Sequence, residues 1–216
     1  MSSENRKELR YAAKELRASG NGSERKISGY AAKFNNLSED LGGFREKLAP
    51  GCFTRTLSLG ADVRMLVDHD SSKILGRTKA GTLTLTQDNV GLRFACVLPD
   101  TQTGRDVYEN IRLGNLSDCS FGFYCTDEDF SEDPQGRGLI RTVSDLDLFD
   151  CSVVTYPAYP GTEVNARSLW PEGRPAYLSA AALETRAHNL GVHVPDSVDK
   201  AMDSLGLRLR IHRLIQ

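Results

Sequence analysis

A histidine between two carboxylates is the first residue of this 216-residue chain whose type and position suggest chemistry. His69 stands in LVDHD, directly after the apolar run 62–67. An imidazole can accept and return a proton near neutral pH, which makes it the usual general base of a hydrolase. The other histidines (His188, His193 and His212) lie near the C-terminus, so His69 is the sole imidazole base available to the rest of the chain. The simpler interpretation is that His69 caps a turn.

A serine within an apolar segment is the second candidate. Ser120 lies in LSDCSFGF and is either an ordinary strand serine or a nucleophile, with Gly122 allowing another part of the chain to approach. No glycine precedes Ser120 by two residues, so this is not the G-x-S-x-G turn of the α/β-hydrolases. Cys119 competes as a nucleophile. Neighbouring side chains of a strand point to opposite faces, so only one of Cys119 and Ser120 can face a given imidazole.

Carboxylates near residue 150 supply the third candidate. Asp145 and Asp147 alternate with leucines and are most simply exposed, whereas Asp150 follows a phenylalanine and precedes the apolar run CSVV. A buried carboxylate needs a partner, and an imidazolium N–H would serve. The simpler interpretation places Asp150 at a strand kink facing water or an arginine such as Arg141.

Other chemistries have little support in the sequence. There is no phosphate-binding loop, no dinucleotide fingerprint and no H-E-x-x-H pair. A metal site built from His69, Asp68 and Asp70 is disfavoured, because adjacent residues diverge and a second histidine is missing. We therefore expect neither a metal nor a cofactor.

Composition narrows the class of protein further. Lys and Arg total 27 against 29 Asp and Glu, which gives no basic field for nucleic acid. The five cysteines are scattered and never form a C-x-x-C pair, so we expect reduced thiols rather than disulfides or zinc. No apolar run approaches the roughly 18 to 20 residues that span a bilayer, and we expect no membrane association.

The elements that must position these residues are mainly strands. The hairpin pattern of 81–98, with alternating apolar residues around QDNVG, is the clearest. Strands are also predicted at 26–34, 62–67 and 116–126, an acidic loop at 127–136, two strand-like runs within 138–157, and helices after Pro50 and over 103–114. The order favours a mainly antiparallel barrel or sheet with a few helices.

The two ends of the chain differ from this central part. Residues 1–25 are rich in charge and are predicted to form a flexible basic arm outside the core, with a short solvated helix over 8–19. Residues 26–167 form the main domain. Residues 168–216 carry a helical spacing of Ala and Leu and are predicted to form a helical C-terminal appendage.

Several segments, taken in order, resemble one known family. They are KISGYAAKF, EKLAPGCFTRTL, VRMLVDHD followed by LGR, GLRFACVLPDT, IRLGNLSDCSFGF and LFDCSVVTYPAYPGTEV. Over about residues 26–167 the chain resembles the prohead maturation proteases of tailed phages, a family that looks distantly related to the herpesvirus assemblins. The resemblance implies an α+β, mainly β fold: an antiparallel β-barrel with surrounding helices.

The resemblance also implies roles for three residues. His69 matches the histidine of the family's N-H-D motif, with Asp68 in place of the usual Asn, and Ser120 matches the serine of S-x-G-F. Asp150 matches the acidic residue before SVVT-PA, where many relatives carry Glu, and Asp147 is its nearest competitor. Ser120 would then be the nucleophile, His69 the base and Asp150 the residue that orients it. Backbone N–H groups of PAYPG (157–161) would stabilise the oxyanion.

The biology implied is that of a serine endopeptidase acting inside the assembling prohead, in the host cytoplasm. Its substrates would be the major capsid protein and its scaffold region, followed by self-cleavage. The portal protein and a homo-oligomer are further candidate partners. The C-terminal segment would be a pro-segment or a scaffold-like element. The alternative is a non-enzymatic capsid assembly or scaffolding module that retains the protease fold, with the C-terminal helices as its working part.

Overall fold

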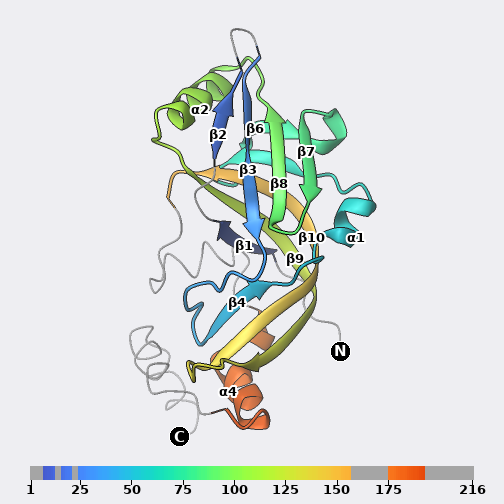
Figure 1. Ribbon diagram of the computed structural model, residues 1–216, viewed down its shortest axis with the longest axis vertical. Helices are drawn as coiled ribbons and strands as arrows, with labels where there is room; N and C mark the ends of the chain where they lie inside the picture. The colour runs from blue at the N-terminus through green and yellow to red at the C-terminus, as the bar shows by residue number, and fades with distance from the viewer. Residues whose placement is uncertain (1–6, 13–15, 21–23, 157–174, 193–216) are drawn as a thin grey trace, which may run out of the picture.

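Two β-sheets form the body of the molecule (Figure 1). The structure, a computed structural model, describes residues 7–12, 16–20, 24–156 and 175–192. The first sheet has the order β1 (Lys7–Ala12), β9 (Asp118–Glu132), β10 (Leu139–Val154), β5 (Arg64–Val67), β6 (Asp70–Arg77), and β4 (Phe44–Leu48) also pairs with β10. The second has the order β2 (Arg17–Ser19), β3 (Lys26–Lys33), β8 (Gly91–Val97), β7 (Leu83–Gln87).

The core lies between the two sheets and follows from the alternation of apolar residues. In β8, Leu92, Phe94 and Cys96 are buried while Arg93 and Ala95 between them face water, which confirms the hairpin predicted for 81–98. The buried side chains of β8 belong to the same cluster as residues of β9 and β10. This packing holds β9 in place through the side chains on its inner face.

The helices cover the ends of the sheets. Those within the described residues are α1 (Thr54–Ser58), α2 (Gln102–Arg112) and α4 (Ala180–Asn189), with short 3-10 turns η1 (Thr78–Ala80) and η2 (Ala176–Leu178). The side chain of Thr101 caps α2 by accepting from Gly104 N at 3.1 Å, and Val107 and Ile111 are buried four residues apart on one face of the helix. This confirms the helix predicted over 103–114. None of the helices that the structure describes has the length and apolar character needed to cross a membrane.

The mainly β character with few helices is confirmed, but the barrel differs from the prediction. The described strands form two sheets rather than one closed antiparallel barrel, and β10 pairs in parallel with both β4 and β5. These parallel pairs join segments far apart in the chain, and residue patterning does not report such pairing. One helix of the predicted C-terminal appendage, α4, is present. The segment 193–216 lies outside the described residues.

The β9–β10 hairpin is longer than predicted and runs along much of the molecule (Figure 1). The acidic loop expected at 127–136 is strand as far as Glu132. The two strand-like runs expected within 138–157 are one strand, β10. Register shifts at Val143/Asp145 and Leu148/Asp150 interrupt the period of two residues, which explains why one strand gives the pattern of two.

The short solvated helix predicted over 8–19 is wrong for the residues that the structure describes there. Instead of a solvated helix, β1 pairs with β9 in the first sheet and β2 pairs with β3 in the second. The charged residues Glu8 and Arg10 are buried in ion pairs with residues distant in the chain. A run of charged residues suggests exposure to solvent, but here the charges are buried because oppositely charged residues from other strands pair with them.

Candidate active site

His69 occupies a tight turn between two strands. Val67 pairs with Asp70, so Asp68 and His69 alone connect β5 to β6, and both have positive φ, 50° and 57°. Turns of this length favour positive φ, and Asn, Asp and His tolerate it better than most residues. The residues after His69 belong to β6. The turn projects the imidazole from the end of a strand whose neighbours fix its position.

The two carboxylates flanking His69 serve the turn and not the imidazole. Asp68 accepts hydrogen bonds from Thr155 N at 2.7 Å and from Thr155 Oγ1 at 2.9 Å, which ties the turn to the chain beyond β10. Asp70 accepts from Ser72 N at 2.9 Å and from Ser72 Oγ at 2.6 Å. Both carboxylates therefore hold the backbone on either side of His69.

The three residues singled out in the sequence lie in one chain of contacts. His69 Nε2 lies 2.6 Å from Ser120 Oγ, and His69 Nδ1 lies 2.6 Å from Asp150 Oδ1. A carboxylate only accepts, so Nδ1 carries the proton that it shares with Asp150. In the neutral ring Nε2 is then the acceptor, facing the hydroxyl whose proton a general base would take.

Three adjacent strands create this arrangement. Ser152 of β10 stands opposite Ser120 of β9, and Asp150 stands opposite Gly122. On its other side β10 pairs with β5, which ends in the His69 turn. Ser120 is completely buried and Asp150 is 3 % exposed, so the contacts between them and the imidazole are shielded from water.

Gly122 makes room for Asp150 and Phe149. A Cβ at this position would lie 2.5 Å from the Phe149 ring and 2.7 Å from Asp150 Oδ2. The bulge between Leu148 and Asp150 directs both side chains toward the glycine. The glycine two residues after Ser120 is therefore required by side chains arriving from β10.

Ser152 is a member of the site that the sequence analysis missed. It is completely buried, it donates to Asp150 Oδ1 at 3.2 Å and it accepts from the backbone N–H of His69 at 3.2 Å. It links the carboxylate to the turn that holds the imidazole. The available signal was its spacing, because residues two apart in a strand share a face with one another.

The competing residues lie elsewhere. Cys119 belongs to the core cluster, and burial raises the pKa of its thiol to about 12, which keeps it protonated. Asp147 is nearly half exposed and pairs with Arg55 at 2.7 Å. Arg141 pairs with Glu46 and other glutamates rather than with Asp150.

Two further expectations concern groups beyond these side chains. The PAYPG segment proposed for the oxyanion hole (157–161) lies outside the described residues. Within the part of the chain that the structure describes, no three His, Cys, Asp or Glu side chains gather so as to hold a metal ion.

A serine, a histidine and an aspartate in this order of contacts define the geometry of hydrolases with a serine nucleophile. The chain belongs to the family of caudovirus prohead serine proteases, whose family model matches residues 10–172. It is thus a serine protease at the level of family membership, and the match begins within the segment predicted to be an arm. Among solved structures, the bacteriophage T4 capsid assembly protease gp21 is similar, with 10% identity, a TM-score of 0.48, and coverage of 71% of this chain and 99% of that one. A search of curated proteins finds no match.

Proposed function

We propose that this protein is a serine endopeptidase in which Ser120 is the nucleophile, His69 the general base and acid, and Asp150 the residue that orients the imidazole. The observation that carries the proposal is the continuous chain Ser120–His69–Asp150, with 2.6 Å at each contact. Family membership independently supports serine protease chemistry.

The contacts suggest a proton route. As Ser120 Oγ bonds to a peptide carbonyl carbon, its proton passes to His69 Nε2, and Asp150 stabilises the imidazolium through Nδ1–H. His69 then protonates the amine nitrogen as the C–N bond breaks, which leaves an acyl-enzyme. Water attacks the ester, gives one proton to His69, and the acyl–oxygen bond breaks with return of that proton to Ser120.

Asp150 is one methylene shorter than the Glu expected at this position, and two local features compensate. The bulge before Asp150 and the absence of a side chain at Gly122 allow the carboxylate to approach the imidazole. Ser152 holds the carboxylate and the His69 backbone together. These features support Asp150 over Asp147 as the third residue.

The substrates we propose are the major capsid protein and its scaffold region, cleaved inside the prohead in the host cytoplasm and followed by self-cleavage. Membership in a prohead protease family supports a role in capsid maturation. The portal protein as a partner, a homo-oligomer, the oxyanion donors of 157–161 and the division into 1–25, 26–167 and 168–216 stay predictions.

The test is co-expression with the cognate capsid protein. We expect wild type to shorten the capsid protein, Ser120→Ala to leave it intact, and Ser117→Ala, a matched control in the same segment, to behave as wild type. Ser117 hydrogen bonds to Asp118 and serves no role in the proposed site. Processing by Ser120→Ala at the wild-type level would reject Ser120 as the nucleophile. An intact capsid protein in every case would favour the non-enzymatic assembly module.

A further inference from the structure

The N-terminal strand β1 lies directly on the proposed nucleophile. It is the edge strand of the first sheet and pairs antiparallel with β9, with Arg10 opposite Phe121 and Tyr11 opposite Ser120. Ser120 Oγ donates to the carbonyl oxygen of Arg10 at 2.8 Å. A hydroxyl has one proton, so Ser120 cannot donate to Arg10 and to His69 at the same moment. The peptide carbonyl of Arg10 therefore lies within hydrogen-bond distance of the proposed nucleophile.

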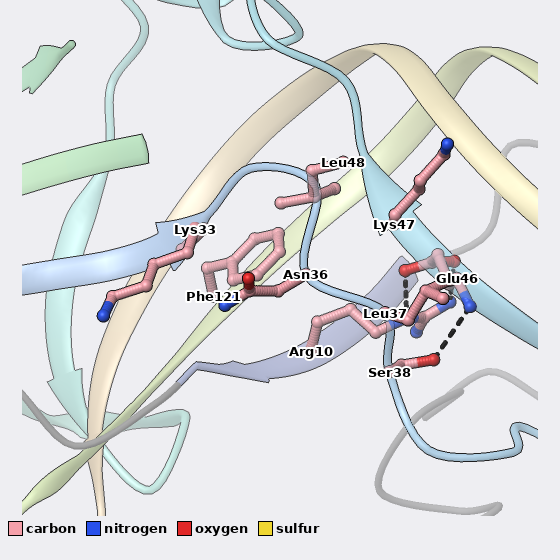
Figure 2. Close-up of a pocket in the computed structure, with 10 residues that line it drawn as sticks. Arg10, Lys33, Asn36, Leu37, Ser38, Glu46, Lys47, Leu48 and Phe121 are labelled. Carbon is pink, nitrogen blue, oxygen red and sulfur yellow. Dashed lines mark hydrogen bonds and ion pairs between the residues drawn. The ribbon is translucent and has the colours of Figure 1, made fainter. Parts of the chain in front are cut away.

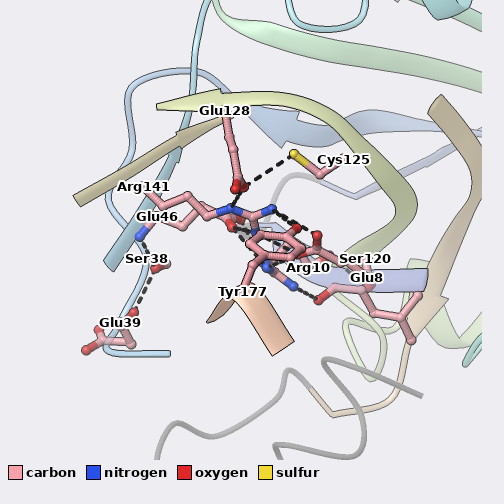
Figure 3. A network of polar contacts seen from close by, with 11 residues as sticks. Glu8, Arg10, Ser38, Glu39, Glu46, Ser120, Cys125, Glu128, Arg141 and Tyr177 are labelled. Atoms are coloured by element: carbon pink, nitrogen blue, oxygen red, sulfur yellow. Dashed lines mark hydrogen bonds and ion pairs between the residues drawn. The ribbon is translucent and has the colours of Figure 1, made fainter. Parts of the chain in front are cut away.

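The side chains of β1 are held by an ion cluster of opposite charges (Figure 3). Arg10 donates to both carboxylate oxygens of Glu46, at 2.7 and 2.9 Å, and Glu8 accepts from Arg141 at 2.6 and 2.9 Å. All four residues are at most 5 % exposed. Glu8 and Arg10 are two residues apart, so one face of the strand presents an acid and a base to matching partners.

The side chain of Arg10 lines a pocket beside this ion cluster. Arg10, Glu46 and Phe121 form part of its lining (Figure 2). Without β1, Glu46 loses the guanidinium of Arg10 and Arg141 loses the carboxylate of Glu8. A buried charge without its partner is strongly unfavourable, so a replacement strand must bring both charges at the same spacing.

The exposed edge that β1 would leave is suited to a peptide strand. Loss of β1 frees the N–H and C=O groups along the outer side of β9, and extended peptides bind such edges through backbone hydrogen bonds. In that binding mode the backbone gives affinity and the side-chain sites give specificity. Here those sites are Glu46 and Arg141, and the reacting carbonyl belongs to the residue that Glu46 selects.

We propose that β1 occupies the substrate site of the protease in cis, and that this site selects peptides with the pattern Glu-x-Arg, cleaved after the arginine. Glu46 is the residue that determines the preference for arginine, and Arg141 selects the acid two residues earlier. β1 withholds Ser120 from other substrates until it is displaced. This proposal rests on the proposed serine endopeptidase function.

Peptide cleavage by the full chain tests the specificity. The substrate is a capped peptide with the sequence of residues 7–12, Lys-Glu-Leu-Arg-Tyr-Ala, compared with the same peptide carrying Gln for Arg. We expect wild type to prefer the Arg peptide by about 10- to 100-fold in kcat/KM. Glu46→Gln should reduce the ratio to below about threefold, while Glu39→Gln, an exposed control nearby, keeps it. Because both peptides are cleaved by the same enzyme sample, the ratio of the two kcat/KM values does not depend on the fraction of folded protein.

Hydrogen exchange tests the occupancy by β1. In full-length Ser120→Ala, excess Arg peptide should raise amide exchange in residues 7–12 several-fold and leave β3 unchanged, and the Gln peptide should have little effect. If the Arg peptide leaves the amide exchange rates of residues 7–12 unchanged, the proposal that β1 occupies the substrate site is wrong. Equal cleavage of both peptides, or a ratio that survives Glu46→Gln, would overturn the specificity. If wild type cuts capsid protein through Ser120 yet shows either result, only this inference fails; without Ser120-dependent cleavage of any substrate, the proposed function fails.

Discussion

At the scale of single residues, the site depends on groups that each hold another in place. Asp150 defines which nitrogen of His69 carries the proton, and Ser152 joins Asp150 to the backbone of His69. The ordinary carboxylates nearby have other partners: Asp68 holds Thr155, and Asp147 holds Arg55. Asp150, Asp68 and Asp147 are the same residue type, and only the position of Asp150 in the fold brings its carboxylate to the His69 ring.

Asp150→Asn should lower the rate of capsid protein cleavage by about 10³- to 10⁴-fold, because the amide favours the wrong tautomer of His69. Asp147→Asn is the matched control, since it removes a carboxylate three residues away that pairs with Arg55 at the surface. It should change the rate by less than about threefold. Initial rates measured with purified variants decide between them. Equal effects of the two substitutions would exclude Asp150 from the proposed role.

Gly122→Ala should reduce activity more than stability. The added methyl group pushes on the Phe149 ring, which is partly exposed and can move, but it also displaces Asp150. A shift of about 1 Å costs on the order of 10²-fold in rate. We expect the unfolding free energy to fall by about 1–3 kcal/mol, measured by urea denaturation beside the rate. Unchanged activity would show that the approach of Asp150 to Gly122 has no catalytic consequence.

At the scale of elements, three strands and one edge strand define the site. β9, β10 and the β5–β6 turn bring Ser120, Asp150 and His69 together, and β1 covers Ser120. β1 is held through charges. Although burial opposes ionisation, the guanidinium groups of Arg10 and Arg141 hold the pKa of Glu8 below its ordinary value of 4.5.

Acid should therefore weaken β1. A carboxyl whose pKa is lowered by folding contributes stability that is fully present above its ordinary pKa and is lost as pH falls through the folded pKa. The difference in unfolding free energy between wild type and Glu8→Gln should stay constant from pH 7 to about pH 5 and shrink below about pH 4.5. Glu24→Gln, a change of an exposed glutamate, is the control. A difference that persists unchanged at pH 3 would contradict the role of the Glu8 charge.

The sequence predicted local features well and distant pairings poorly. The hairpin of β7 and β8, helix α2 and the three residues of the site were accessible from periodicity and from the family resemblance. The bulged β10 was predicted as two strands because the register shifts break its alternation. β1 was predicted as solvated because its partners, such as Glu46 and Arg141, are more than thirty residues away. The first failure comes from a local irregularity within one strand, and the second comes from pairing over a long sequence distance.

At the scale of the whole molecule, a second apolar cluster lies apart from the main core. It joins Leu178, Leu183 and Ala187 of the C-terminal part to Phe44 of β4 and Leu139 of β10. Helix α4 thus packs on the far end of the long hairpin that carries Asp150 (Figure 1). The predicted appendage is, in its described part, a packed element of the fold.

Leu183→Ala should lower the unfolding free energy by about 2–5 kcal/mol, because Leu183 is 4 % exposed and its removal leaves a cavity. Leu190→Ala, at the end of the same helix and 48 % exposed, should cost less than about 1 kcal/mol. Urea denaturation of both variants gives the comparison. Equal small losses would mean that α4 contributes nothing to the stability of the body.

In the proposed mechanism Ser120 and His69 act as one catalytic unit. The most direct measurement is the initial rate of cleavage of purified capsid protein by wild type, Ser120→Ala, His69→Ala and the double variant. When two residues act as one unit, removing the second after the first costs no further activity. The double variant should therefore be no slower than either single variant, and each single variant should be at least about 10³-fold slower than wild type. Losses that multiply in the double variant, or a Ser120→Ala variant that cleaves as wild type does, would show that Ser120 and His69 are not one catalytic unit.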